Sequence, residues 1–103
     1  MRRAARTDRN QTEIVAALRH LGASVEPSHA VGGGCPDLLV GFRNRTLLLE
    51  VKDGAKPPSE RRLTPDQVAW HQSWRGQKAV VTTTEEAIAV VIRVDFQLKG
   101  KPV

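Results

Sequence analysis

The stretch that decides the fold is PDLLVGFRNRTLLLEVK, residues 36–52. Two apolar runs in this stretch are separated by a short polar segment, a pattern that predicts a β-hairpin. Successive side chains of a strand point to opposite faces of the sheet, so Glu50 and Lys52 are expected to project together, while the apolar residues that alternate with them face a core. The hairpin is expected to bring Asp37, at the start of the first strand, close to Glu50 and Lys52.

The patterns on either side of the hairpin predict the order α-β-β-β-α-β-α. Apolar residues recur at helical spacing in three segments and form short runs typical of strands in the others. The expected helices cover residues 8–21, 64–75 and 83–92, and the expected strands cover residues 23–26, 37–40, 46–52 and 78–82. The last helical segment is rich in Val and Ile, so a strand there is an open alternative. Strands interrupted by crossover helices predict an α/β fold with a mixed central sheet flanked by helices.

The clearest local signal is the start of the second helix, TPDQ at residues 64–67. Thr64 is a good N-cap, a proline follows at the first helical position, and Gln67 can complete a capping box. Upstream, the glycines at 32–34 predict a loop of permissive backbone. The proline before Asp37 favours an extended backbone that delivers this aspartate at the start of its strand.

Length and composition set limits on the class of protein. A chain of 103 residues, 40% hydrophobic and 26% charged, fits one domain over residues 1–103, with a basic arm at 1–7 and a C-terminal tail at 94–103. The single cysteine excludes an internal disulfide, and no apolar run is long enough to span a membrane. We therefore expect a cytoplasmic protein of a bacterial or phage-infected cell. Its net charge of +5 favours a polyanionic partner.

The expected cluster of two carboxylates and one ammonium suits the hydrolysis of phosphodiesters. Asp37 and Glu50 offer the oxygen ligands that Mg²⁺ or Mn²⁺ prefers, and the backbone carbonyl of Val51 is a further candidate ligand. Lys52 cannot ligate a cation while it is charged, but its ammonium can hold the attacking water and offset negative charge on the phosphate. The cation and Lys52 together would offset the repulsion between the two carboxylates.

Four motifs, taken in this order, resemble those of the PD-(D/E)XK nuclease superfamily, and more closely its virus-type replication-repair nuclease branch, VRR-NUC. The motifs are NQTE at 10–13, GCPD at 34–37, EVK at 50–52 and LTPDQ at 63–67, and the resemblance covers residues 9–91. It implies the α-β-β-β-α-β core of that superfamily. It also implies cleavage of DNA with Mg²⁺ or Mn²⁺, in a branch whose small stand-alone members are likened to Holliday junction resolvases.

The resemblance assigns roles to five side chains. Asp37 and Glu50 would bind the metal, and Lys52 would be the catalytic lysine. Glu13 would complete the metal site from the first helix, and Gln67 would point into the same pocket. The last two residues also have simpler explanations, because helical glutamates are mostly solvated and the capping box alone accounts for Gln67.

Several other residues have two open interpretations. Cys35 and the three histidines do not have the spacing of a structural zinc site. His29, beside the glycine loop, either touches substrate or is a solvated loop residue. Asn10 is either a supporting residue of the site or a surface residue. Trp70 and Trp74, one helical turn apart, are expected in the core or in a subunit contact rather than as a pair that stacks on bases.

The expected activity is that of a structure-directed, Mg²⁺- or Mn²⁺-dependent DNA endonuclease that reads the backbone and shape of branched or duplex DNA. Six basic residues, in the N-terminal arm and in the loop after the EVK strand, are the candidate phosphate contacts: Arg2, Arg3, Arg6, Lys56, Arg61 and Arg62. A homodimer is expected, with residues 87–92 and the two tryptophans as its contact surface. Two alternatives stay open: a non-catalytic nucleic-acid-binding module, and a structural subunit of a phage or repair assembly that retains the nuclease fold.

Overall fold

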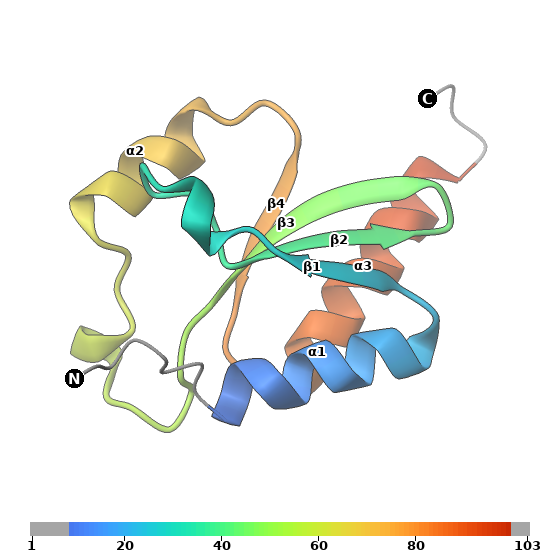
Figure 1. Cartoon of the computed structure of the whole chain (residues 1–103), viewed down its shortest axis with the longest axis horizontal. Helices are drawn as coiled ribbons and strands as arrows, with labels where there is room; N and C mark the ends of the chain where they lie inside the picture. The colour runs from blue at the N-terminus through green and yellow to red at the C-terminus, as the bar shows by residue number, and fades with distance from the viewer. Residues whose placement is uncertain (1–8, 100–103) are drawn as a thin grey trace.

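The computed structural model describes residues 9–99, which form a four-stranded sheet and three helices (Figure 1). In chain order the elements are α1 (Arg9–Leu21), β1 (Ser24–Pro27), β2 (Leu38–Phe42), β3 (Arg45–Val51), α2 (Pro65–Ser73), β4 (Gln77–Val81) and α3 (Thr84–Leu98). The predicted order α-β-β-β-α-β-α is therefore confirmed. No helix in this part of the chain is long and apolar enough to cross a membrane.

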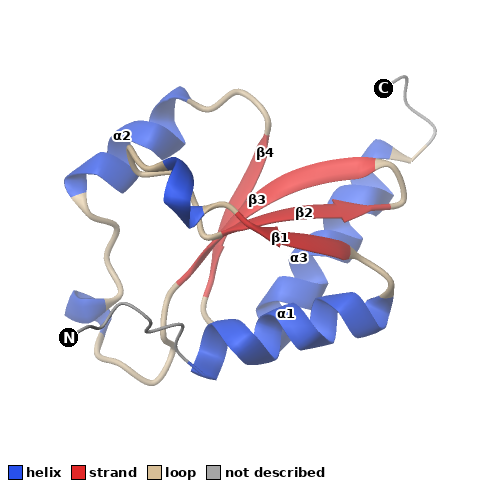
Figure 2. Ribbon diagram, viewed as in Figure 1, coloured by secondary structure: helices blue, strands red, loops and turns tan. Residues whose placement is uncertain are grey.

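The sheet is mixed, as predicted, and its strands follow the order β1-β2-β3-β4 (Figure 2). β1, β2 and β3 form an antiparallel meander, and β4 pairs parallel to β3 after the crossover through α2. Leu38 lies opposite Leu49 in the β2–β3 hairpin. This register continues to Asp37 and Glu50, so the hairpin brings the two acidic residues next to each other.

The hairpin turn is made by Arg43 and Asn44. Both have positive φ angles, of 50° and 66°. Two successive left-handed residues suit the twist of a tight hairpin, and asparagine adopts this conformation more readily than most residues. Arg43 also forms an ion pair with Asp95 of α3, at 3.3 Å between Nη1 and Oδ2, which ties the turn to the C-terminal helix.

The hydrophobic core lies between one face of the sheet and the helices α1 and α3, which lie on the same side of it (Figures 1 and 2). Ile14 and Leu18 of α1 are fully buried against it. From β3 the core takes Leu47, Leu49 and Val51, the alternating side chains that the sequence assigns to it. Glu50 and Lys52 consequently project from the opposite face, where α2 lies.

The segment after Thr83 is a helix, as predicted, and the alternative of a strand is excluded. The expected tail is wrong at its start, because the helix continues to Leu98 and residues 94–98 belong to α3. Val94 is buried in the core. Within 87–92, Ala87, Val90 and Val91 are buried in the same core, whereas Ile92 is exposed, so only the outer side of the helix is left for a subunit contact, which stays a prediction. The reason is the helical period, which turns every third or fourth apolar residue inward.

The helix α2 differs from α1 and α3 because none of its residues is buried. Its start follows the prediction: Thr64 accepts a hydrogen bond from the backbone of Gln67, and the Gln67 side chain accepts one from the backbone of Thr64, which completes the capping box. The helix ends at Ser73, earlier than expected. The predicted cap of α1 by Asp8 lies outside the described residues.

Candidate active site

Asp37 is held at the start of β2 by backbone contacts on three sides. Its Oδ2 accepts a hydrogen bond of 2.9 Å from the backbone N–H of Val51, across the hairpin. Its backbone carbonyl accepts one of 2.8 Å from the N–H of Ser28. The Ser28 hydroxyl donates to the carbonyl of Pro36, again at 2.8 Å. The carboxylate is thus fixed beside the end of β3.

Glu50 and Lys52 project from β3 toward the same place, as their alternation predicts. The Lys52 Nζ lies 3.7 Å from Oε2 of Glu50. Glu50 is only 3% exposed and is one of two buried polar residues in the described part of the chain. Burial of a carboxylate is costly unless a positive charge lies beside it, and the Lys52 ammonium is such a charge.

Gln67 joins these two side chains from the first turn of α2. Its Oε1 accepts a hydrogen bond of 2.9 Å from the Lys52 ammonium, and its Nε2 donates one of 3.2 Å to Oε2 of Glu50. The same Oε1 accepts the N–H of Thr64 in the capping box. Gln67 therefore completes the helix cap and contacts Lys52 and Glu50 at the same time. Its catalytic role stays a prediction.

The two carboxylates influence each other's ionisation. Burial, and next the negative charge of Asp37, raise the pKa of Glu50 from 4.5 to about 8, although Lys52 opposes the shift. Two carboxylates held this close cannot both ionise freely without a compensating charge. A site of this kind stabilises a cation that binds between its acids.

The residues present fit a divalent metal ion. Oε1 of Glu50 is buried and has no hydrogen-bond partner within the described region, so this oxygen is available as a ligand. Asp37 lies beside it and shares its electrostatic environment. Mg²⁺ is commonly bound through one or two carboxylates, with waters and phosphate oxygens completing its shell. Asp37 and Glu50 meet that requirement.

Glu13 lies apart from this pair. It lines a polar hollow of about 320 Å³ together with Asp53 and Glu85, near the ends of β3 and β4. Among residues 9–99, no three histidine, cysteine or acidic side chains lie close enough to hold a metal ion together. The structure thus does not bring Glu13 to Asp37 and Glu50 as a third ligand, and its metal-binding role stays a prediction.

Asn10, one turn before Glu13, has a clear supporting role. Its Nδ2 donates hydrogen bonds to the carbonyls of Lys52, at 2.9 Å, and Thr82, at 3.0 Å. These carbonyls follow the last residues of β3 and β4. Asn10 therefore clamps the ends of the two parallel strands and fixes the backbone of Lys52. The amide of Val51 binds Asp37, while the role of the Val51 carbonyl as a metal ligand stays a prediction.

The candidate DNA contacts fall into two groups. Arg2, Arg3 and Arg6 lie outside the described residues. Lys56 and Arg62 are exposed in the loop that joins β3 to α2, whereas Arg61 is partly buried. This loop leaves the site directly after Lys52, so its exposed basic groups stand close along the chain to the catalytic candidates.

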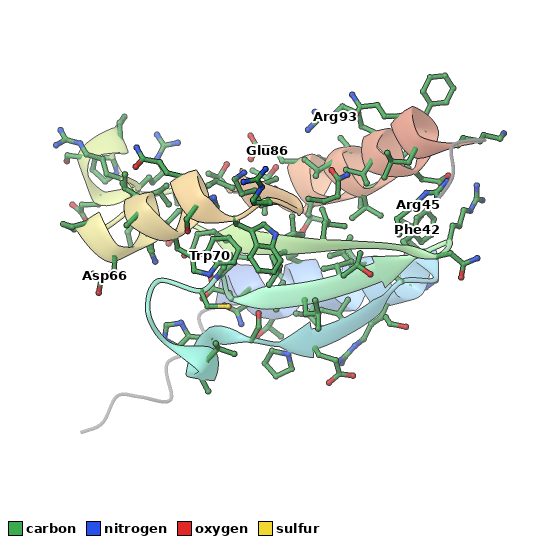
Figure 3. The ribbon with its side chains drawn as sticks, turned by 90° about the horizontal axis from the view of Figure 1, so that it is seen from above. Phe42, Arg45, Asp66, Trp70, Glu86 and Arg93 are labelled. Atoms are coloured by element: carbon green, nitrogen blue, oxygen red, sulfur yellow. The ribbon has the colours of Figure 1, made fainter. Side chains whose placement is uncertain are left out.

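The two tryptophans do not belong to the core. Trp70 and Trp74 stack on each other along α2, with ring centroids 4.8 Å apart, and Trp74 is 41% exposed. Figure 3 shows Trp70 on the side of α2 that faces the sheet, whereas Asp66 points away from it. The core interpretation is therefore wrong, and a subunit contact remains the prediction.

Sequence reasoning missed Ser28 as part of the site and left His29 undecided. Ser28 grips the backbone on both sides of the Asp37 Cα, and the Nδ1 of His29 lies 3.5 Å from Oδ1 of Asp37. Neither residue carries a motif signal. The only hint in the sequence is that both precede the glycine loop that leads into Asp37.

Comparison with known proteins gives one informative match. No family model matches the chain, and no curated protein matches it. A solved structure described as a VRR_NUC domain matches with a TM-score of 0.62 and 27% sequence identity, over 82% of this chain and 91% of that one. Such a fold indicates a nuclease domain. This likeness confirms the resemblance to the VRR-NUC branch of the PD-(D/E)XK nuclease superfamily that the sequence motifs carry.

Proposed function

We propose that the protein is a divalent-metal-dependent DNA endonuclease that hydrolyses phosphodiester bonds with Mg²⁺ or Mn²⁺. One observation carries the proposal: Asp37, Glu50 and Lys52 converge on one face of the sheet, and Glu50 has a buried oxygen without a hydrogen-bond partner in the described part of the chain. The VRR_NUC match supports the nuclease class. The charge of +5 supports a polyanionic substrate.

Each side chain has a separate task in this proposal. Asp37 and Glu50 hold the metal ion, which when bound supplies an activated water and offsets charge on the phosphate. Lys52 orients the attacking water and stabilises negative charge that develops on the phosphate oxygens. Gln67 fixes the direction of the Lys52 ammonium through its 2.9 Å hydrogen bond.

Substrate binding is proposed to depend on backbone phosphates and DNA shape. The basic groups of the loop after β3, chiefly Lys56 and Arg62, and Arg2, Arg3 and Arg6 of the N-terminal segment would bind phosphates, with Arg61 contributing from its partly buried position. Base edges are read by elements that enter a groove, and the sequence suggests no such element. A structure-directed activity on branched DNA follows as the finer part of the proposal.

A homodimer is proposed because one compact site cuts one strand, whereas both strands of a branched substrate need two symmetric sites. The exposed apolar side chains available to it include Leu39, Val68, Trp74 and Val80 on the face that carries α2, and Ile92 and Phe96 on α3. Sedimentation at micromolar concentration would show about twice the 11.3 kDa mass of the chain. A species of single-chain mass alone at that concentration would remove the dimer.

The decisive experiment is a cleavage panel with four-way junction, flap, duplex and single-stranded DNA in Mn²⁺, Mg²⁺ and chelator. We expect cleavage that needs metal and favours the branched substrates. Lys52→Ala should lower the cleavage rate by about two to three orders of magnitude while leaving DNA binding intact. Replacement of Lys99, an exposed lysine at the end of α3, by alanine should leave the cleavage rate unchanged. Absence of metal-dependent cleavage on every substrate would favour a non-catalytic binding module or a structural subunit.

A further inference from the structure

Several contacts that hold Asp37 in place come from one short segment, Ser28 and His29. Ser28 donates its backbone N–H to the carbonyl of Asp37 and its hydroxyl to the carbonyl of Pro36, both at 2.8 Å. These two carbonyls flank the Asp37 Cα. Ser28 is buried, so its hydrogen bonds are protected from water and restrict the backbone rotation of Asp37 on both sides.

His29 extends the same support to the carboxylate. Its Nδ1 lies 3.5 Å from Oδ1 of Asp37, while the other oxygen, Oδ2, accepts the N–H of Val51 at 2.9 Å. One oxygen is thus held from β3 and the other is approached from the 3₁₀ turn His29–Val31. Oδ2 is thus held by a hydrogen bond, and the imidazole is the neighbour on the side of Oδ1.

The backbone around His29 is held in place by its neighbours in the fold. Its neighbour Ser28 is anchored by two hydrogen bonds, and the glycine loop that follows the turn packs through Gly34 against the start of α2 at Asp66. The imidazole itself is 78% exposed. The backbone therefore fixes the point from which the ring extends beside Asp37. The ring itself is open to solvent, so His29 can be replaced without disturbing the core.

We propose that Ser28 and His29 form a positioning element for Asp37, in which the imidazole Nδ1–H donates to Oδ1 and orients the carboxylate toward the metal shared with Glu50. The inference rests on the proposed metal-binding role of Asp37. Groups that hydrogen-bond to metal ligands fix their orientation, and their removal typically weakens metal binding by about 10- to 100-fold.

The test measures Mn²⁺ affinity by calorimetry, which needs no cleavage. His29→Ala should weaken Mn²⁺ binding by about tenfold. His29→Asn should recover most of this loss, because the asparagine amide places an N–H close to where Nδ1 stands. His20→Ala, at an exposed histidine near the end of α1, is the matched control and should bind Mn²⁺ like the unmodified protein. Ser28→Ala should also weaken binding, with its folding checked by circular dichroism.

Cleavage kinetics provide a second readout. Because the defect of His29→Ala lies in metal binding, saturating Mn²⁺ should restore most of its rate, whereas Lys52→Ala should stay inactive at any Mn²⁺ concentration. Equal Mn²⁺ affinity in His29→Ala and the unmodified protein would overturn the inference, as would an asparagine variant as weak as the alanine one. If the unmodified protein binds Mn²⁺ without cleaving DNA, the proposed function is wrong while the positioning role of His29 can still hold. If it binds no Mn²⁺, the proposed function and the positioning role are both wrong.

Discussion

The side-chain amide of Gln67 accepts a hydrogen bond from the Lys52 ammonium at 2.9 Å, and this interaction joins α2 to the site. Since no residue of α2 is buried, the helix is held less by apolar packing than α1 and α3 are. The other end of the amide donates to Glu50. The position of α2 and the direction of the Lys52 ammonium are therefore coupled through one side chain.

Replacement of Gln67 by alanine is expected to lower kcat by about tenfold, because Lys52 and Glu50 lose their common hydrogen-bond partner. The capping box is lost as well, which should destabilise the helix start by about 1 kcal/mol. Gln72→Ala, on the exposed side of the same helix, is the control. Single-turnover cleavage measures the effect, and a Gln67→Ala variant as fast as the control would show that Lys52 needs no such support.

Gly34→Ala should displace α2 from the site. A Cβ at this position would lie 2.3 Å from the carbonyl oxygen of Asp66, and the residue has a φ of +88°. Gly33→Ala is a matched control, since Gly33 also has a positive φ, +65°, but a Cβ there meets nothing within 4 Å. We expect both variants to lose stability because of the positive φ, Gly34→Ala more than Gly33→Ala because of the collision, and only Gly34→Ala to lose cleavage as well. Equal rates in the two variants would contradict the role of this close approach.

Much of the fold was predictable because its signals are local. Alternation along β3 correctly separates Leu49 from Glu50, and the cap at Thr64 correctly starts α2. The end of α3 was not predictable in the same way. Its continuation to Leu98 depends on tertiary contacts, including the burial of Val94 and the hydrogen bond from Arg45 of β3 to the Leu98 carbonyl. These contacts join segments far apart in the sequence.

In the candidate site too, residues placed by local signals were predictable and residues placed by distant contacts were not. Asp37, Glu50 and Lys52 belong to one hairpin, so strand geometry alone predicts that they meet. Gln67 could be placed with them only through the family resemblance, because a long loop separates β3 from α2 and the sequence does not show where that loop leads. Ser28 has no motif, and its contacts arise from the way the chain returns from β1 to β2. The position of Glu13, apart from Asp37 and Glu50, could not be derived from helical spacing.

The stability of the metal-free protein should fall as pH rises. The pKa of Glu50 is raised from 4.5 to about 8 by burial and by Asp37, so between these values the folded chain holds a proton that the unfolded chain has lost. Unfolding then releases this proton, and the free energy of unfolding decreases with pH. Urea unfolding in chelator at pH 5 and pH 8 measures the change.

Two variants make this dependence specific to Glu50. Glu50→Gln should remove the decrease attributable to this carboxyl and should be more stable than the unmodified protein at pH 8 in chelator. Glu26→Gln, at an exposed position of β1, should keep the decrease. The addition of Mn²⁺ at pH 8 should stabilise the unmodified protein and not Glu50→Gln. An unchanged slope in Glu50→Gln would assign the dependence to other groups.

Asn10→Ala is expected to loosen the ends of β3 and β4. It removes both hydrogen bonds from Asn10 to the carbonyls of Lys52 and Thr82, at a cost of about 1–3 kcal/mol in unfolding free energy if these carbonyls stay dry. Asn10→Asp should cost more, since a carboxylate cannot donate and would face two carbonyl oxygens. Gln97→Ala, exposed on α3, is the control for thermal unfolding. Equal stability of the three variants would exclude the clamp.

The loop after β3 should contribute to DNA affinity through charge alone. The double variant Lys56→Ala with Arg62→Ala is expected to weaken binding to all DNA sequences alike and to reduce the slope of log K against log salt by about 0.9 for each phosphate that is no longer neutralised. The matched control removes the same charge elsewhere, with Arg93→Ala and Lys99→Ala on α3. Fluorescence anisotropy from low to moderate salt gives the slopes. If both pairs reduce the slope equally, binding depends on net charge rather than on this loop. If only the loop pair does, its exposed lysine and arginine lie on the phosphate backbone, beside the strand end that carries Lys52.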